Sequence, residues 1–225
     1  MSKWYFDDKS QPDSSYQVRT RDYIDCLIQK AKDRVPWYYL DMDFWLWEAL
    51  EMHSVQGKRV LILGSNIPWY EAICIESGAA ECWTLEYNHL RWDHPQIRTI
   101  QVADFDASVR SGRLKLDFDQ VWSFSALEHD GLGRYGDPLS PTADFAAMDK
   151  FCSYLNKNGF LIFSVPIGKD LVIFNAGRIY GRLRLERMFK NWDVQDSFGW
   201  SHIDFDRDIY LPSAQGHHHF TCDSN

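Results

Sequence analysis

The chain has 225 residues, of which 45% are hydrophobic and 25% charged, and its net charge at neutral pH is −8. This composition is that of a globular protein large enough to bury a substantial core. The negative charge argues against a nucleic-acid partner and an anionic membrane surface, because both need a basic face.

No apolar run approaches the ~20 residues of a membrane span, and the first residues lack the apolar stretch of a secretory signal. The cysteines are five scattered residues without Cys-x-x-Cys spacing: Cys26, Cys74, Cys82, Cys152 and Cys222. Free buried thiols in a reducing compartment are the simplest interpretation. We therefore expect a cytoplasmic protein; the oligomeric state stays open.

Residues 1–56 are expected to form a helical extension. Its first 18 residues are polar, and we expect them to be poorly ordered or draped over the surface. Apolar side chains then recur at helical spacing over 19–33 and again over 41–55, with Pro36 between the two segments. These two helices are expected to cover one edge or the open end of the domain that follows.

Strands and helices alternate over residues 57–215, which predicts one α/β domain with a mostly parallel sheet. The expected strands are 59–63, 81–86, 97–102, 119–125 and 159–165. The expected helical segments are 68–78, a short turn near 89–93, 141–157 and 181–190. Residues 192–198 alternate like a further strand, and 216–225 are a tail or a final strand around 219–222.

The helix over 141–157 carries the clearest end signals. Ser140 is placed as its N-cap and Pro141 as its first residue. Gly159 is expected just beyond its last turn. The segment should therefore cross over between the fourth and fifth strands.

The ends of the first four expected strands lie about 20 residues apart, near Gly64, Glu86, Asp104 and Ser125. A glycine directly after a buried strand permits a tight turn against a ligand. An acid at the end of the next strand can accept hydrogen bonds from both hydroxyls of a ribose. Asp104 could accept from an adenine amino group beside Phe105. This spacing predicts a site for a nucleotide-type cofactor.

At these positions the chain resembles the class I S-adenosylmethionine-dependent methyltransferases. The matching segments are 60–64, 85–86, 103–104, 121–129 and 155–163. Residues 127–139 and 174–181 are similar to a narrower, methyltransferase-like family known as a domain of unknown function and numbered 268. The resemblance implies a Rossmann-like three-layer sandwich that uses S-adenosylmethionine and releases S-adenosylhomocysteine. The cofactor-binding residues that it implies are Gly64, Ser65, Asn66, Glu86, Tyr87, Asp104, Phe105, Ser125 and Leu127.

The chain departs from the superfamily at one position. Asn66 stands where the first motif carries its second glycine. One alternative is therefore a methyltransferase fold that binds or scaffolds without catalysis. A second alternative, a nicotinamide-dependent oxidoreductase, is disfavoured because its Gly-x-Gly-x-x-Gly pattern would need glycine where the chain has Asn66 and Trp69.

The long loop over 126–140 follows the fourth strand and is expected beside the reacting end of the cofactor. His129 is the candidate base, since its ordinary pKa of ~6.5 suits proton transfer at neutral pH. Glu128 or Asp130 could orient it. The alternative is that these side chains only brace the loop.

The expected acceptor is a hydroxyl or carboxylate of a small molecule or glycan, with oxygen methylation favoured. The residues expected to hold it are Arg134, Tyr135, Asn175 and Arg178. We expect no metal, because His129 and its acidic neighbours are adjacent in sequence and their side chains diverge. Further ligands from His202, Asp204 or the histidines at 217–219 are disfavoured, since consecutive histidines are typical of a flexible polar segment.

Overall fold

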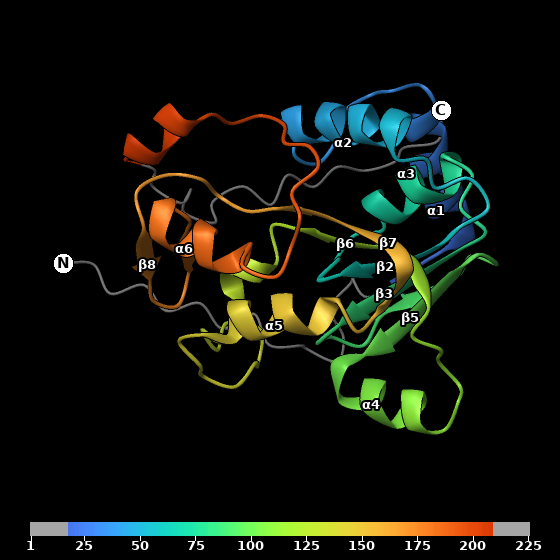
Figure 1. The fold of residues 1–225 in the computed structure, drawn as a ribbon. Helices are drawn as coiled ribbons and strands as arrows, with labels where there is room; N and C mark the ends of the chain where they lie inside the picture. The colour runs from blue at the N-terminus through green and yellow to red at the C-terminus, as the bar shows by residue number, and fades with distance from the viewer. Residues whose placement is uncertain (1–17, 209–225) are drawn as a thin grey trace.

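The computed structural model describes residues 18–208, and a five-stranded parallel sheet forms its centre (Figure 1). In spatial order its strands are β5 (Ile97–Gln101), β3 (Glu81–Glu86), β2 (Arg59–Leu63), β6 (Phe118–Phe124) and β7 (Leu155–Ser164). In chain order this is third, second, first, fourth and fifth, which is the Rossmann-like arrangement. The predicted fold class is confirmed, and the expected strands 59–63 and 81–86 have the observed bounds.

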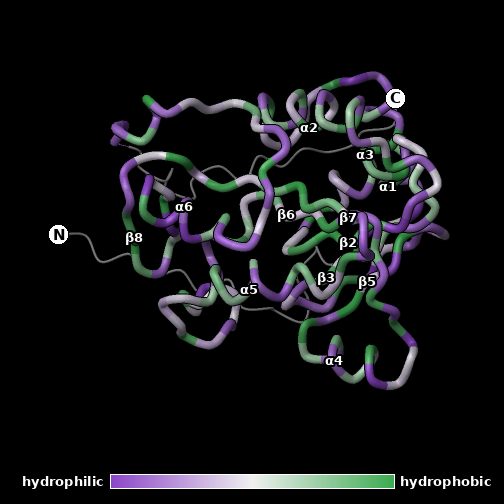
Figure 2. The backbone as a smooth tube through the Cα atoms, in the orientation of Figure 1, coloured by the Kyte–Doolittle hydropathy of each residue, from purple (hydrophilic) through white to green (hydrophobic). Residues whose placement is uncertain are grey.

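Helices cover both faces of the sheet, and alternate residues of each strand serve the two faces. Val60 and Ile62 of β2 belong to one buried cluster, whereas Leu61 and Leu63 belong to the other. On the first face lie α1 (Arg21–Lys32), α2 (Asp41–Met52) and α3 (Trp69–Glu76). On the second face lie α4 (Val102–Arg110), α5 (Ala143–Phe151) and α6 (Arg182–Met188). Figure 2 shows the hydrophobic residues concentrated in the central strands.

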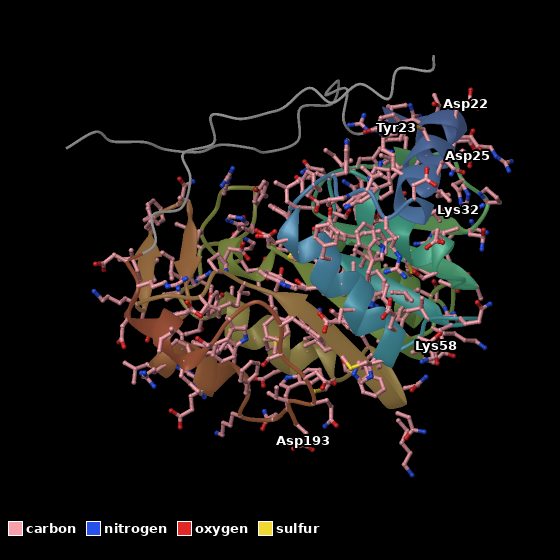
Figure 3. All side chains as sticks on the ribbon, turned by 90° about the horizontal axis from the view of Figure 1, so that it is seen from above. Asp22, Tyr23, Asp25, Lys32, Lys58 and Asp193 are labelled. Atoms are coloured by element: carbon pink, nitrogen blue, oxygen red, sulfur yellow. The ribbon has the colours of Figure 1, made fainter. Side chains whose placement is uncertain are left out.

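Helix α1 has both a side-chain N-cap and a stripe of apolar residues at helical spacing. The Thr20 hydroxyl accepts the backbone N–H of Tyr23 as an N-cap. Ile24 and Leu27 are fully buried on its inner side, while Asp22 and Asp25 point outward (Figure 3). The helices of the expected extension thus share one buried cluster with α3 on this face of the sheet.

Two small sheets lie outside the central one. β1 (Val18–Arg19) pairs in parallel with β4 (Arg91–Trp92), where the sequence suggested a helical turn near 89–93. β8 (Leu171–Ile173) and β9 (Gly177–Ile179) form an antiparallel hairpin. The hairpin lies against the loop after β6, beside the short 3-10 helix Leu127–His129.

The prediction for 141–157 is wrong at both ends. Helix α5 begins after Thr142, and Ser140 belongs to the preceding loop, where its backbone N–H is bonded to the Gly131 carbonyl at 2.9 Å. It ends at Phe151, because the chain enters β7 at Leu155. Gly159 therefore lies inside a strand, where an added Cβ would fall 2.9 Å from the Leu155 Cβ. It permits a close approach there and ends no helix.

Two further predictions fail. Helix α4 follows β5 without a separating loop, since Gln101 ends the strand and is also the N-cap. The sequence carries no turn residue at this junction, so the helix was missed. Residues 192–198 form no strand, although their alternation is real, because no neighbouring strand pairs with them among the described residues. Residues 202–206 form a short 3-10 helix.

Several expectations concern residues outside the described range. The segment 1–18, for which poor order was expected, falls outside that range except for its last residue. The tail 216–225, with its expected strand at 219–222 and the histidines 217–219, falls outside it entirely. The domain boundaries 1–56, 57–215 and 216–225 stay predictions. No helix within residues 18–208 combines the length and apolar character needed to cross a membrane.

The cysteine interpretation holds for part of the set. Cys74, Cys82 and Cys152 are free, and the first two are fully buried. Cys26 is disulfide-bonded, contrary to the expectation of free thiols. Sequence spacing carried no signal of this. Because disulfides persist mainly in oxidising compartments, the cysteines lend no support to the cytoplasmic expectation.

Deleting a core leucine of β2 should be costly, whereas an exposed leucine should be nearly neutral. Leu61 is fully buried, while Leu183 of α6 is 78% exposed. We expect Leu61→Ala to lower the free energy of unfolding by about 2–5 kcal/mol and Leu183→Ala by less than about 0.5 kcal/mol. Urea unfolding followed by circular dichroism measures both. Equal losses in the two variants would contradict the packing described here.

Candidate functional site

A cavity of about 250 Å³ opens at the carboxyl ends of β2, β3 and β6. This is the point where the strand order reverses, and open α/β sheets bind ligands at such points. The volume is just under the ~300 Å³ at which small-molecule sites begin. The predicted residues that line it are Gly64, Ser65, Asn66, Glu86, Tyr87, Ser125, Leu127, His129, Asp130 and Tyr135. Ten of the sequence-derived candidates thus meet at one place.

Gly64 lies in the turn after β2, which forms one wall of the cavity. Its φ is +71°, a backbone conformation that other residues rarely adopt. An added Cβ would fall 2.6 Å from the Ala126 Cβ, so the turn after β2 and the turn after β6 approach too closely for any side chain. The glycine therefore serves both the turn and the close approach.

The next two residues differ in what they do. The Ser65 hydroxyl lies 3.0 Å from the Glu71 Oε2 and braces the turn against α3. Thr84 of β3 donates to the other oxygen of Glu71 at 2.8 Å. The Asn66 Oδ1 is buried and has no hydrogen-bond partner among the described residues. An unpaired acceptor in a cavity wall is suited to a ligand donor.

Glu86 ends β3 and is 5% exposed. Its Oε1 accepts the backbone N–H of Asn88 at 3.1 Å and the Asn88 side-chain amide at 3.0 Å. Burial raises the pKa of Glu86 to about 7, although the hydrogen bonds from Asn88 oppose the shift. The carboxyl group is thus oriented by Asn88 at the position expected of a ribose partner.

The structure does not bring Asp104 and Phe105 into the cavity, which corrects their assignment to an adenine site. Both belong to α4, because the helix begins immediately after β5. Asp104 is exposed in the first turn of that helix. Phe105 is 3% exposed and packs 5.1 Å from the Tyr154 ring, within the second buried cluster. Neither lines the cavity.

The loop after β6 presents His129 in a defined orientation. Its Nδ1 lies 2.6 Å from the Ala176 carbonyl oxygen, which can only accept a hydrogen bond. The neutral ring must therefore carry its proton on Nδ1 and keep a lone pair on Nε2. The Nε2 lies 3.8 Å from the Glu128 Oε1. This is the tautomer that a general base needs.

The two acids beside His129 occupy different positions. Glu128 is 1% exposed and does not line the cavity, and Ser125 donates to its Oε1 at 2.5 Å. Burial raises the pKa of Glu128 above its usual range. Asp130 does line the cavity, and burial together with the nearby Asp137 raises its pKa to about 7. Glu128 is thus placed to support His129, while Asp130 faces the ligand space.

Three of the four residues expected to hold the acceptor do not line the cavity. Arg178 is fully buried, and its guanidinium donates to the backbone carbonyls of Glu128, Asp130 and Ser140. Asn175 is fully buried as well. These two lie on the β8–β9 hairpin, which packs against the loop after β6 and does not line the cavity. The direction in which they point is set by tertiary packing and has no sequence signal.

Of the other two residues expected to hold the acceptor, Tyr135 lines the cavity and Arg134 does not. Arg134 lies over the Tyr135 ring at 5.1 Å and reaches the Ala176 carbonyl at 3.5 Å, away from the cavity. Tyr135 lines the cavity, with its ring 5.6 Å from that of His129. Only Tyr135 therefore keeps its expected place.

Several cavity residues were missed. Tyr38 and Tyr39 reach it from the connection between α1 and α2, and Tyr70 reaches it from α3. Val102, Lys150, Phe151 and Tyr154 also line it. The only available signal was the high aromatic content, 16% of the chain, which suggested stacking walls without saying which rings form them. Within residues 18–208 no group of three or more His, Cys, Asp and Glu could hold a metal ion.

Strand order and site position together define a Rossmann-like α/β protein with a ligand cavity at its switch point. Residues 57–221 match the model of the family described as "Caenorhabditis protein of unknown function, DUF268". The match spans well over half of the chain, and the chain belongs to this family. No curated protein sequence matches it.

Solved structures show distant likeness. A Streptococcus mutans protein described as an S-adenosylmethionine-dependent methyltransferase is 19% identical, with a TM-score of 0.41 over 56% of this chain and 35% of that one. An S-adenosylmethionine-dependent methyltransferase from Mesorhizobium loti is 18% identical, with a TM-score of 0.37 over 53% of each chain. A third similar structure is a complex of the Haloferax volcanii Trm112 methyltransferase activator with a protein described as a methyltransferase. Its sequence identity is 16%, with a TM-score of 0.45 over 85% of this chain and 83% of that one. The chain thus spans only about a third to a half of the first two proteins.

Arg178 is expected to act on the loop and not on a substrate. Lysine keeps the charge but cannot bond three carbonyls through one planar group. We expect Arg178→Lys to lower the free energy of unfolding by about 2–4 kcal/mol and to speed hydrogen exchange over 126–140. Arg110→Lys, at the exposed end of α4, is the control. A stable Arg178→Lys protein with an unchanged loop would contradict this role.

The buried acids should make stability depend on pH. Burial raises the pKa of Glu71 from 4.5 to about 7. The folded state therefore binds more protons than the unfolded state between these values, and stability falls as pH rises through that window. Each such group contributes a slope of up to about 1.4 kcal/mol per pH unit.

We expect Glu71→Gln to flatten this slope, measured by urea unfolding at intervals from pH 5 to pH 8. Glu48→Gln, on the exposed side of α2, is the matched control. Parallel profiles for the Glu71→Gln variant and the parent protein would refute the assignment.

Proposed function

We propose that this protein is an S-adenosylmethionine-dependent methyltransferase that methylates an oxygen of a small molecule or glycan. The observation that carries the proposal is the meeting of Gly64, Glu86 and His129 around one cavity at the switch point. These are the turn, the acid and the base that a nucleoside cofactor and a proton-losing acceptor need. The resemblance of the strand-end motifs to class I methyltransferases supports the same conclusion.

The residues present fit the cofactor. Gly64 lines the cavity with backbone alone, because the approach of Ala126 leaves no room for a Cβ, and Glu86 stands where a ribose acid is needed. The buried Asn66 Oδ1 and Ser123 hydroxyl lack partners among the described residues, and both residues line the cavity. Asn66 thus offers an acceptor where the superfamily has a glycine. Tyr87 and Tyr154 replace Asp104 and Phe105 as candidate neighbours of the adenine.

When bound, S-adenosylmethionine supplies a methyl group activated by its sulfonium. The protein positions the acceptor and receives its proton. The bound cofactor would give up its methyl group and leave as S-adenosylhomocysteine, its methyl carbon–sulfur bond breaking as the acceptor oxygen bonds to that carbon. The proton of the acceptor hydroxyl would pass to the Nε2 of His129. The buried Glu128 stabilises the positive charge that His129 then carries, while the Ala176 carbonyl holds the ring in place.

Calorimetric titration with S-adenosylhomocysteine tests the proposal. We expect saturable binding to the parent protein, and affinity weakened about tenfold or more in Glu86→Ala, because a hydrogen bond to a charged group is worth about 1.5–3 kcal/mol. Glu186→Ala, on the exposed side of α6, is the control. Absence of binding at millimolar ligand would overturn the proposal and favour a binding or scaffold role.

A further inference from the structure

The outer edge of β7 is an open end of the central sheet. Within residues 18–208 no strand lies beyond it, and no backbone–backbone hydrogen bond joins residues 160–163 to any segment other than β6. These residues are nevertheless only partly exposed. Backbone N–H and C=O groups that are shielded from water normally have partners. An unpaired edge of this kind is a template for a further strand.

Residues 189–200, called the strap below, pass this edge on their way from α6 to α2 (Figure 1). At the start of the strap the Phe189 ring lies 5.9 Å from that of Phe163, within the buried cluster that contains α6. Farther along, the Asp196 carboxylate lies 2.8 Å from the ring Nε2 of His53, at the end of α2 on the opposite face. No backbone–backbone hydrogen bond joins the strap to β7. The strap therefore crosses the edge without closing it.

A cavity of about 890 Å³ lies between β7, the strap and α2. In a sheet, each residue of a strand occupies roughly 160 Å³, given a strand spacing of about 4.8 Å, a layer thickness of about 10 Å and an advance of about 3.3 Å per residue. The cavity therefore has room for about five extended residues. Protein interiors hold few voids larger than a water molecule, so a space of this size is not an ordinary packing defect.

The walls on both sides of this cavity are apolar. Trp45 and Leu46 line it from α2, and Leu185 and Phe189 line it from the side of α6. A strand between these walls would be covered on both faces, and strands buried in this way are continuous apolar runs rather than alternating ones. The cavity therefore suits an extended segment of apolar, β-branched residues.

The charged residues that line the cavity are mostly acidic. Apart from His53, those among the described residues are three carboxylates and one arginine: Asp193, Asp196, Asp204 and Arg207. Arg207 pairs with Asp204 at 2.8 Å, and Asp196 pairs with His53. Lys157 and Lys190 adjoin lining residues in the chain but do not line the cavity. The excess of negative charge favours a partner with basic residues beside its apolar run. A second copy of this chain, with its net charge of −8, is less suited.

We propose that the edge of β7 beneath the strap is a docking site for a partner protein, which inserts an extended apolar segment flanked by basic residues and so adds a sixth strand to the sheet. The unpaired backbone edge supplies the hydrogen bonds, and the apolar walls select the side chains. The inference does not depend on the proposed methyltransferase function, because this cavity is separate from the one at the carboxyl ends of β2, β3 and β6.

A fluorescently labelled peptide, Lys-Lys-Val-Ile-Val-Ile-Val-Lys-Lys, serves as the probe, and its binding to the full chain is measured by fluorescence anisotropy. We expect saturable binding. Two further peptides carry backbone N-methyl groups, one on the three valines and the other on the two isoleucines. A strand added at a sheet edge pairs through only one edge of its own backbone. One methylated peptide should therefore bind at least about tenfold more weakly, since it loses two or more hydrogen bonds, while the other stays within about threefold of the parent peptide.

Two protein variants test the location of the site. Val194 lies on the strap, lines the cavity and is 53% exposed, so Val194→Lys should leave the fold intact. We expect it to weaken the peptide by about threefold or more, because it places a charge beside the apolar run and repels the flanking lysines. Leu183→Lys, at a more exposed position that does not line the cavity, is the matched control and should change nothing.

A peptide with glutamates in place of the flanking lysines tests the charge, and we expect it to bind about threefold or more weakly at low salt. Absence of peptide binding to the full chain, or a Val194→Lys variant that binds as the parent protein does, would overturn the inference. Equal losses for the two methylated peptides would indicate an apolar ligand site without strand pairing. Dimerisation that Val194→Lys abolishes, in a protein that does not bind the peptide, would assign the edge to a second copy. Glutamate-flanked peptide binding as tight as the original would contradict a basic partner.

Discussion

The arrangement of the site depends on one buried guanidinium. Arg178, fully enclosed, donates to three carbonyls of the loop after β6 and lies 3.8 Å from the Asp144 carboxylate. Asp144 in turn receives Arg184 at 2.7 Å and the Tyr180 hydroxyl at 3.0 Å. Burying such a charge is costly, and the cost is offset only because its partners are preorganised. The same contacts hold the backbone that carries His129, so the loop gains a defined shape although it has little regular structure.

The first face of the sheet contributes to the site as well as to stability. α1 and α2 complete a core that α3 alone could not fill, and the connection between them brings Tyr38 and Tyr39 to the cavity. A site assembled in this way joins residues that are nearly ninety positions apart, such as Tyr39 and Ser125. The same N-terminal segment therefore both covers the sheet and completes the cavity wall.

Sequence reasoning succeeded where short-range physics decides the structure. β2 and β3 are buried apolar runs, and Gly64 and Glu86 follow from the ends of those runs. It failed where a boundary lacks a local signal, as at Gln101, where strand passes directly into helix. It also failed for Arg178 and Tyr39, since their roles depend on the direction in which a hairpin or a connection packs. Residue type indicated chemistry in these cases, but only tertiary contacts decide whether a cation faces a ligand or a carbonyl.

The concentration of acids at the cavity carries a cost that the rest of the molecule must offset. Burial raises the pKa values of Glu86 and Asp130, which line the cavity, to about 7, and it does the same for Glu71, which contacts the cavity wall only through Ser65. Each ionised form is therefore disfavoured in the folded protein. A sequence selected for stability alone would place amides or apolar groups there. The two apolar clusters on either side of the sheet make these groups tolerable. Acids kept at such a cost, around an opening at the strand ends, are better explained by a ligand than by the fold.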